Sequence, residues 1–457
     1  MPSFTVAPAS ASASASASAS AFFTVKASEL LSACKAAEAF RKGASALRGF
    51  RSYGLDADSL FFSSTGEGLI VEGFCWREAF ALWLPSGKLS DCGGFSLPFA
   101  SLLPFVKATK GKGFLSFEQG KLSASASGAS LTVEAGPSLF NSEAAESQKT
   151  LRGSHYLASL LSSDLTEAHQ GFPLAPFLSV APFCSDDASK LVLCGAGFSD
   201  GNFFATDGFS LRKQDASLSG FPKAAAGMLE DAWLPSWLAP CIEALSKPAE
   251  RKGLLAFHWP ERMECQALRF WLPSGLCAAF RFSKAASFPN CQQLISKSLP
   301  YSFSFDRESF LSMVEGLLQS LKAYDGLPCI DFFFDEPIGT VEASVTLQRN
   351  KGSKKRPELE DVGSQEASVS AFFTGFHRDP SYDNGFFDLP ESQQETAKAK
   401  FSLESRLCCN AFFLQKALKS FSDNRLQFQW SNAGSPFIVS NGSPASLALI
   451  MPVQKRR

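Results

Sequence analysis

The sequence predicts a mixed α+β fold made of three similar domains, each with two helices packed on antiparallel sheets. One order of elements recurs six times: a short strand, an amphipathic helix and then alternating strands. Hydrophobic residues make up 45% of the 457 residues and charged residues 19%, enough to build cores. Phenylalanine alone contributes 45 residues. Pro, Gly or charge interrupts every apolar run before the roughly 18 residues that a membrane span needs.

The N-terminal residues 1–21 are predicted to be a flexible tail. Residues 9–21 alternate Ala and Ser. Alternating Ser prevents the continuous apolar run of a signal peptide, and no basic residues precede it. We therefore expect the first domain to occupy residues 22–148.

The first domain contains two copies of the repeated unit. A strand at 23–26 precedes a helix at 28–42, and a strand at 95–98 precedes a helix at 99–108. The first helix has an apolar face formed by Leu30, Leu31, Cys34, Ala37 and Phe40. Further strands are expected at 60–62, 68–72, 113–118, 121–125 and 130–134.

The middle domain is assigned to residues 149–298. Its weaker copy of the unit has a helix at 173–182 and a strand at 191–198. A second helix is expected at 236–245, after Leu234 and Pro235. Strands at 254–259 and 267–271 follow it.

The last domain is assigned to residues 299–457. Its expected elements are strands at 301–306 and 329–334 around a helix at 307–322, then a strand at 400–403, a helix at 410–421 and strands at 426–430 and 436–440. The segment 350–399 combines a basic run, an acidic run and turn-forming residues. This composition cannot easily bury a core, so we interpret much of the segment as an irregular surface insertion.

The charge balance and the absence of catalytic motifs argue against several classes of protein. The chain has 43 Lys and Arg against 44 Asp and Glu, a net charge of −1, so attraction to nucleic acid would need a local basic surface. It has no glycine-rich phosphate loop and no nucleophile elbow, and its four histidines lie far apart. The sequence thus favours a non-catalytic protein without cofactor or metal. Twelve cysteines without a C-x-x-C pair indicate buried thiols in a cytoplasmic protein.

Three short segments carry a resemblance to a known family. They are Ala205-Thr-Asp-Gly-Phe-Ser-Leu211, Ser287-Phe-Pro-Asn-Cys-Gln-Gln-Leu-Ile295 and Leu447-Ala-Leu-Ile-Met-Pro-Val453. In this order, on the six-unit pattern, they resemble the bacterial DNA sliding clamp, the β subunit of DNA polymerase III. That family has A-T-D-G-H-R-L, F-P-[DN]-Y and M-P-M-R-L at these places. The chain differs at Phe209 and Ser210, where the family usually has His and Arg.

The resemblance implies a function that needs no catalysis. Two subunits would form a homodimeric ring of six similar domains around duplex DNA, without sequence specificity. The ring would be a processivity factor that binds the replicative polymerase, the clamp loader and other partners through their clamp-binding motifs. No membrane is involved. Candidate DNA-facing residues are Lys35, Arg41, Lys42, Arg48, Lys107, Lys110, Lys112, Lys322, Lys416 and Lys419.

The resemblance also implies a hydrophobic pocket for partner peptides between the middle and last domains. The matching positions are Leu191, Thr206, Gly208, Phe209, Ser210, Leu211, Pro289, Leu294, Phe413, Ile450, Met451, Pro452 and Val453. Two alternatives remain open: a diverged clamp-fold interaction or structural module without ring closure, and an enzyme of unknown class.

Overall fold

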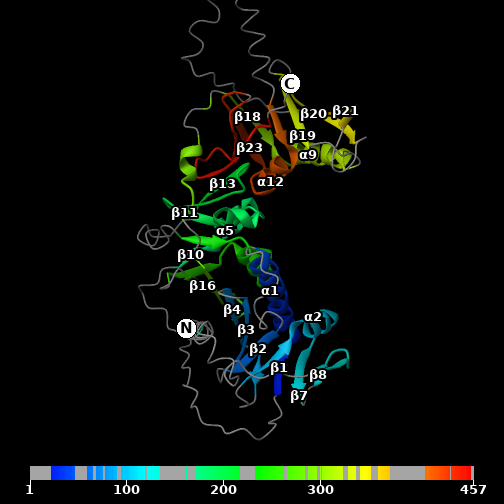
Figure 1. Cartoon of the computed structure of the whole chain (residues 1–457), viewed down its shortest axis with the longest axis vertical. Helices are drawn as coiled ribbons and strands as arrows, with labels where there is room; N and C mark the ends of the chain where they lie inside the picture. Colours follow the sequence, from blue (N-terminus) through cyan, green and yellow to red (C-terminus); the bar gives the residue numbers. More distant parts are fainter. Residues whose placement is uncertain are drawn as a thin grey trace, which may run out of the picture. The chain divides into compact units, whose positions relative to one another are not determined.

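The fold is described from a computed structural model of the whole chain (Figure 1). The structure describes residues 22–46, 59–64, 68–75, 78–89, 94–118, 121–133, 161, 171–216, 232–260, 265–283, 287–295, 299, 301–322, 328–335, 340–350, 359–370, 407–432 and 434–453. The predicted tail 1–21, Arg48 and the expected strand 400–403 lie outside these residues. The chain divides into a first unit (residues 1–178, 186–201 and 216–288) and a second unit (residues 179–185, 202–215 and 289–457).

The first unit begins with a small antiparallel sheet and two helices. The sheet has the order β5-β1-β7-β8-β9. Its strands are β1 (Phe22–Lys26), β5 (Lys88–Leu89), β7 (Phe114–Glu118), β8 (Lys121–Ala124) and β9 (Ser130–Thr132), and the helices are α1 (Ala27–Ala46) and α2 (Phe99–Ala108). The predicted helix at 99–108 is confirmed at both ends. The helix predicted at 28–42 is confirmed and continues to Ala46.

Stacked phenylalanine rings form the core beneath this sheet. Phe23 stacks on Phe62, Phe95 and Phe117 with ring centroids 5.4, 5.7 and 5.8 Å apart. All four side chains are almost completely buried. Stacked aromatic rings stabilise a core beyond what the burial of their apolar area contributes. This core therefore accounts for part of the high phenylalanine content.

A continuous sheet of eight antiparallel strands runs through the rest of the first unit in the order β10-β15-β16-β17-β4-β3-β2-β6. The strands are β2 (Ser59–Ser64), β3 (Leu69–Cys75), β4 (Glu78–Leu84), β6 (Phe95–Pro98), β10 (Phe172–Pro173), β15 (Leu255–Pro260), β16 (Cys265–Trp271) and β17 (Cys277–Ser283). Strands β4 and β17, which pair with each other, were not predicted from the sequence. Their pairing joins the predicted first and middle domains.

Helix α1 packs against α7 (Leu238–Leu245) within the first unit. Phe40 of α1 meets Trp237 edge to face at 5.1 Å, and the thiol of Cys241 donates to the carbonyl of Ala36. The buried face of α1 has helical spacing, as its sequence predicts. Helix α5 (Leu174–Val180) begins in the first unit, which also contains α8 (Pro248–Arg251) and the paired strands β11 (Gly195–Ser199) and β14 (Trp233–Pro235).

In its described residues, the second unit contains two antiparallel sheets and two α-helices of 15 and 9 residues. One sheet has the order β12-β13-β25-β24-β23-β18, and the other has the order β21-β20-β19-β22. The strands are β12 (Asn202–Thr206), β13 (Ser210–Asp215), β18 (Tyr301–Asp306), β19 (Cys329–Asp335), β20 (Thr340–Asn350), β21 (Leu359–Ser370), β22 (Leu407–Asn410), β23 (Arg425–Trp430), β24 (Phe437–Ser440) and β25 (Ser446–Ile450). Helices α9 (Arg307–Leu321) and α12 (Ala411–Lys419) pack together.

Two sequence predictions were wrong in detail. Residues 191–198 are not a strand throughout: a 3₁₀ helix, η3, spans Ala188–Cys194, and β11 begins only at Gly195. The carboxylate of Asp187 caps η3 by accepting from the amide of Ser189, and this local bond overrides the strand-like apolar run. Within the expected irregular insertion 350–399, Leu359–Ser370 forms strand β21 paired with β20, although its described side chains, at 361 and 364–368, are mostly exposed.

A strand that was not predicted from the sequence, β22 (Leu407–Asn410), leads into α12 and pairs with β19. The division into three domains at residues 149 and 299 stays a prediction. Among the described helices, none is long and apolar enough to cross a membrane.

Candidate functional site

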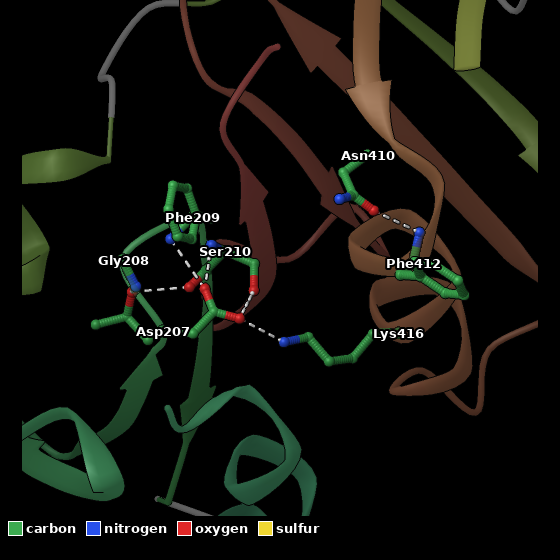
Figure 2. Close-up of polar contacts among 8 residues, drawn as sticks. Asp207, Gly208, Phe209, Ser210, Asn410, Phe412 and Lys416 are labelled. Atoms are coloured by element: carbon green, nitrogen blue, oxygen red, sulfur yellow. Dashed lines mark hydrogen bonds and ion pairs between the residues drawn. The ribbon is translucent and has the colours of Figure 1, made fainter. Parts of the chain in front are cut away.

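The site is built around the tight turn between β12 and β13, inside the second unit. Figure 2 shows the carboxylate of Asp207 organising this turn. Its Oδ1 accepts from the amides of Phe209 at 2.9 Å and Ser210 at 2.7 Å, and its Oδ2 accepts from the Ser210 hydroxyl at 2.9 Å. A short acidic side chain that bonds to amides just ahead of it is typical of such turns. The exposed Phe209 is therefore held on a well-defined backbone.

Thr206 and Gly208 complete the turn. The Thr206 hydroxyl donates to the carbonyl of Ser210 at 2.7 Å and accepts from the amide of Gly208 at 3.0 Å. Gly208 has a φ of 93°, a conformation that side chains with a Cβ rarely adopt. Both residues belong to the predicted site, and they shape its backbone.

Helix α12 contributes a cation to the turn. The ammonium of Lys416 lies 2.7 Å from Asp207 Oδ2. Burial alone would raise the pKa of Asp207. The hydrogen bond and charge of Lys416, together with the amides of Phe209 and Ser210, outweigh burial, so the pKa of Asp207 lies below its usual value. Lys416, predicted from the sequence as a candidate DNA-facing residue, forms this ion pair in the structure.

The C-terminal segment lies beside the turn. Strand β25 pairs with β13 so that Ile450 is opposite Ser210, and the amide of Met451 donates to the carbonyl of Phe209 at 2.9 Å. The amide of Val453 donates to the carbonyl of Cys408 at 2.8 Å. Pro452 forms an antiparallel β-bridge with Cys409 of β22. The C-terminal segment is thereby held against both the turn and β22.

An exposed apolar surface results. Phe209 is 56% exposed and Met451 41% exposed, and the Phe209 ring stacks on Phe413 with centroids 5.9 Å apart. By contrast, Leu211 and Ile450 are 1% and 0% exposed, so they support the surface from below. We name the surface formed by Phe209, Phe413 and Met451 the aromatic platform.

The remaining predicted pocket residues lie in two places. Leu294, in the 3₁₀ helix η4 (Cys291–Leu294), is exposed in the second unit, as is Pro289. Leu191 lies in η3 of the first unit and is 36% exposed. These positions stay predictions.

Sequence reasoning missed two members of the site, Asp207 and Phe183. Asp207 stood inside the quoted segment Ala205–Leu211, and its position before Gly could have marked it as the residue that shapes the turn. Phe183 had no sequence signal. It lies in the 3₁₀ helix η2 (Ala181–Phe183), and its ring meets the Lys416 ammonium at 4.7 Å.

The predicted basic residues of the first unit gather on α1, α2 and the loop after α2. Glu38 of α1 accepts from Lys42 at 3.1 Å and from Lys107 of α2 at 2.9 Å, which brings those two ammonium groups together. Lys35, Lys110 and Lys112 are exposed. Arg41 lies over the Phe99 ring at 4.8 Å.

In the second unit, Lys322 is exposed at the end of α9, and Lys419 pairs with Glu315 at 2.8 Å. Within the described residues, no group of three His, Cys, Asp or Glu side chains could hold a metal ion.

Comparisons with known proteins identify the fold. No family model matches the sequence, and no curated protein matches it by sequence. The structure, however, matches solved DNA polymerase sliding clamps over nearly the whole chain, so the chain has the sliding-clamp fold.

The sliding clamp of Bacillus subtilis is 13% identical with a TM-score of 0.62, and 96% of this chain covers 100% of it. The clamp of Bartonella birtlesii, solved with griselimycin, is 15% identical with a TM-score of 0.62, at coverages of 95% and 100%. The Helicobacter pylori clamp bound to a DNA ligase peptide is 13% identical with a TM-score of 0.59, at coverages of 95% and 100%.

Proposed function

We propose that this protein is a DNA sliding clamp, a non-catalytic processivity factor that encircles duplex DNA and binds its partners through the aromatic platform. The observation that carries the proposal is the platform itself. On a clamp fold, three segments far apart in sequence place the exposed side chains of Phe209 and Met451 and the half-buried ring of Phe413 around one hydrogen-bonded turn. One solved clamp of this fold is bound to a DNA ligase peptide.

The chemistry of the platform suits a short hydrophobic peptide. Aromatic rings and a flexible methionine can bury leucine or phenylalanine anchors, and such residues dominate binding energy at interfaces. The ion pair between Lys416 and Asp207 is internally neutral, so the platform offers mainly apolar contact. We expect the replicative polymerase and the clamp loader to be among the partners that carry such a peptide.

The basic side chains on α1 and α2 support DNA binding. Lys42 and Lys107 share one carboxylate, so the helix pair retains positive charge for the phosphate backbone. A closed ring would hold DNA topologically, and weak, sequence-blind contacts would then suffice. The ring would be a homodimer, as the resemblance to the sliding-clamp family implies.

Peptide titration tests the platform. A fluorescent Gln-Leu-x-Leu-Phe peptide should bind with a saturating rise in polarisation. Met451→Asp should weaken binding by at least tenfold, because a carboxylate would have to be desolvated against the peptide's apolar anchors. The matched control is Leu255→Asp, which changes a residue 51% exposed in the first unit. Equal loss in both variants, or no binding by the folded wild-type protein, would contradict the proposed site.

DNA titration tests the basic surface. Lys107→Glu should weaken binding of a labelled duplex and reduce its salt dependence, because one phosphate contact is lost and one repulsion gained. Lys121→Glu, on an exposed residue of β8, is the control with the same charge change. The mass of the protein in solution tests dimerisation, and release from a circular plasmid upon its linearisation tests encirclement. Equal effects of the two variants would refute a DNA surface on α1 and α2.

A second candidate is a clamp-fold interaction module that does not close into a ring. The observation that favours it is that α5 and α7 contain no Lys or Arg, unlike α1 and α2. Such helices would contribute no positive charge to a DNA channel. A monomeric mass together with intact peptide binding would support this candidate over the clamp.

A further inference from the structure

Lys416 joins three separate segments beneath the aromatic platform. Its ammonium pairs with Asp207 at 2.7 Å and lies 4.7 Å from the Phe183 ring and 5.3 Å from the Phe413 ring. The Lys416 side chain is 23% exposed and that of Asp207 is 14% exposed. A mostly buried ion pair of this kind differs from a surface pair, because either charge left alone would lack adequate solvation.

The bonds of Asp207 determine where Phe209 lies. The same carboxylate that pairs with Lys416 accepts from the amides of Phe209 and Ser210 and from the Ser210 hydroxyl. The next carbonyl along, that of Phe209, accepts from the amide of Met451. A chain of bonds therefore runs from the Lys416 ammonium to both exposed members of the platform, and Figure 2 shows its first part.

We propose that Lys416 is a positioning residue of the peptide site, which acts through Asp207 to hold Phe209 stacked on Phe413 and ready for an uncharged apolar anchor. The inference rests on the proposed function, since it concerns the same peptide site. Lys416 itself does not touch the peptide. It keeps the Asp207 carboxylate ionised in its buried place, and that carboxylate keeps the turn in shape.

The ion pair between Lys416 and Asp207 also affects which peptides the site binds. Because Asp207 neutralises Lys416, the affinity of an apolar peptide should depend little on salt. Asp207→Asn would leave the cation without its partner beneath the platform. That variant should bind a peptide with an aspartate beside its apolar anchors more tightly, relative to the uncharged peptide, than the wild-type protein does.

The decisive experiment measures the turn in the free protein. The backbone amides of Phe209, Ser210 and Met451 should exchange their hydrogens at least tenfold faster in Lys416→Met than in the wild-type protein. In this variant no ammonium holds the Asp207 carboxylate, which accepts from the amides of the turn. Lys416→Arg retains the cation and should restore most of the protection. Exchange in α9 should stay unchanged in both variants, which shows that the unit remains folded. Unchanged protection of the turn in Lys416→Met would overturn the proposal.

Peptide binding gives the second readout. Lys416→Met should weaken the Gln-Leu-x-Leu-Phe peptide roughly tenfold, and Lys416→Arg should bind nearly as the wild-type protein does. Without the ammonium the pKa of Asp207 rises, so binding should be lost at a higher pH on acidification than in the wild-type protein. If Lys416 had a merely structural role, Lys416→Met would lower the affinity without changing the pH at which binding is lost. An unchanged pH of loss would therefore count against positioning through Asp207.

The two proposals fail in different ways. If the wild-type protein binds no peptide, the proposed function is wrong, while hydrogen exchange still decides whether Lys416 fixes the turn. If the wild-type protein binds and Lys416→Met binds equally well, the peptide site stands and the positioning role is refuted.

Discussion

Replacing Gly43 by alanine should destabilise the first unit, although helix propensity alone predicts the opposite. Gly43 lies in the last turns of α1, beside Trp237. Alanine favours a helix interior over glycine by about 1 kcal/mol. A Cβ at this position, however, would lie 2.0 Å from Cβ of Trp237 and 3.2 Å from its Cα. The clash involves backbone and a Cβ, which cannot rotate away.

The magnitudes decide the sign. Carbon atoms in contact normally lie about 3.5–4.0 Å apart, so α1 or the segment that carries Trp237 must shift by well over an ångström. Overpacking of a tight core costs about 1–3 kcal/mol and sometimes more. This cost exceeds the propensity gain, and the contact between α1 and α7 would loosen. Because the clash is with a backbone atom and a Cβ, the overpacking cost should lie at about 2–3 kcal/mol, and we expect a net loss of about 1–2 kcal/mol, or a fall in Tm of several degrees.

Gly316→Ala is the matched control. Gly316 also lies inside a helix, α9, but a Cβ there would meet nothing within 4 Å. Here only propensity acts, so this variant should gain about 0.5–1 kcal/mol. Urea titrations followed by circular dichroism compare the two, and tryptophan fluorescence reports mainly on the first unit, which holds six of the seven tryptophans. If both variants are stabilised, the close approach of Gly43 to Trp237 is refuted.

Two further predictions concern single carboxyl groups. Burial raises the pKa of Glu72 to about 8 from an ordinary value of 4.5. The stabilising contribution of its neutral form is therefore complete below the ordinary value and is lost as the pH rises through about 8. The Tm should fall between about pH 5 and pH 9, and Glu72→Gln should remove much of that fall, whereas parallel curves would contradict the assignment. Asp306 caps α9 by accepting from the amide of Ser309 at 2.8 Å, so Asp306→Ala should cost about 1 kcal/mol in a urea titration, and an unchanged midpoint would contradict the cap.

The local elements were largely predictable from the sequence. The helix Phe99–Ala108 follows a strand that ends in proline, and its apolar side chains repeat at helical spacing, so both its ends could be predicted. The turn at Asp207 and the end of the chain at Met451 carried motifs, and both lie at the candidate site. Short-range propensity and periodicity act between neighbours in the sequence, which is why these features can be read from it.

The strands that depend on partners distant in sequence could not be predicted. Strands β4 and β17 were missed because side chains on both their faces are largely buried, which removes the alternation that marks a strand. Strand β21 was missed for the opposite reason: its sequence is largely polar, its described side chains are mostly exposed, and its pairing with β20 makes it a strand. In each case a partner distant in sequence supplies the stabilising contacts.

The same division holds at the site. The sequence by itself determined the turn, through Asp207 and Gly208, and the apolar character of Phe209 and Met451. Only the tertiary structure decided that Lys416, 209 positions away in the sequence, pairs with Asp207. An ion pair has no sequence signature, because its energy depends on the distance between two charges and on their burial, and folding sets both.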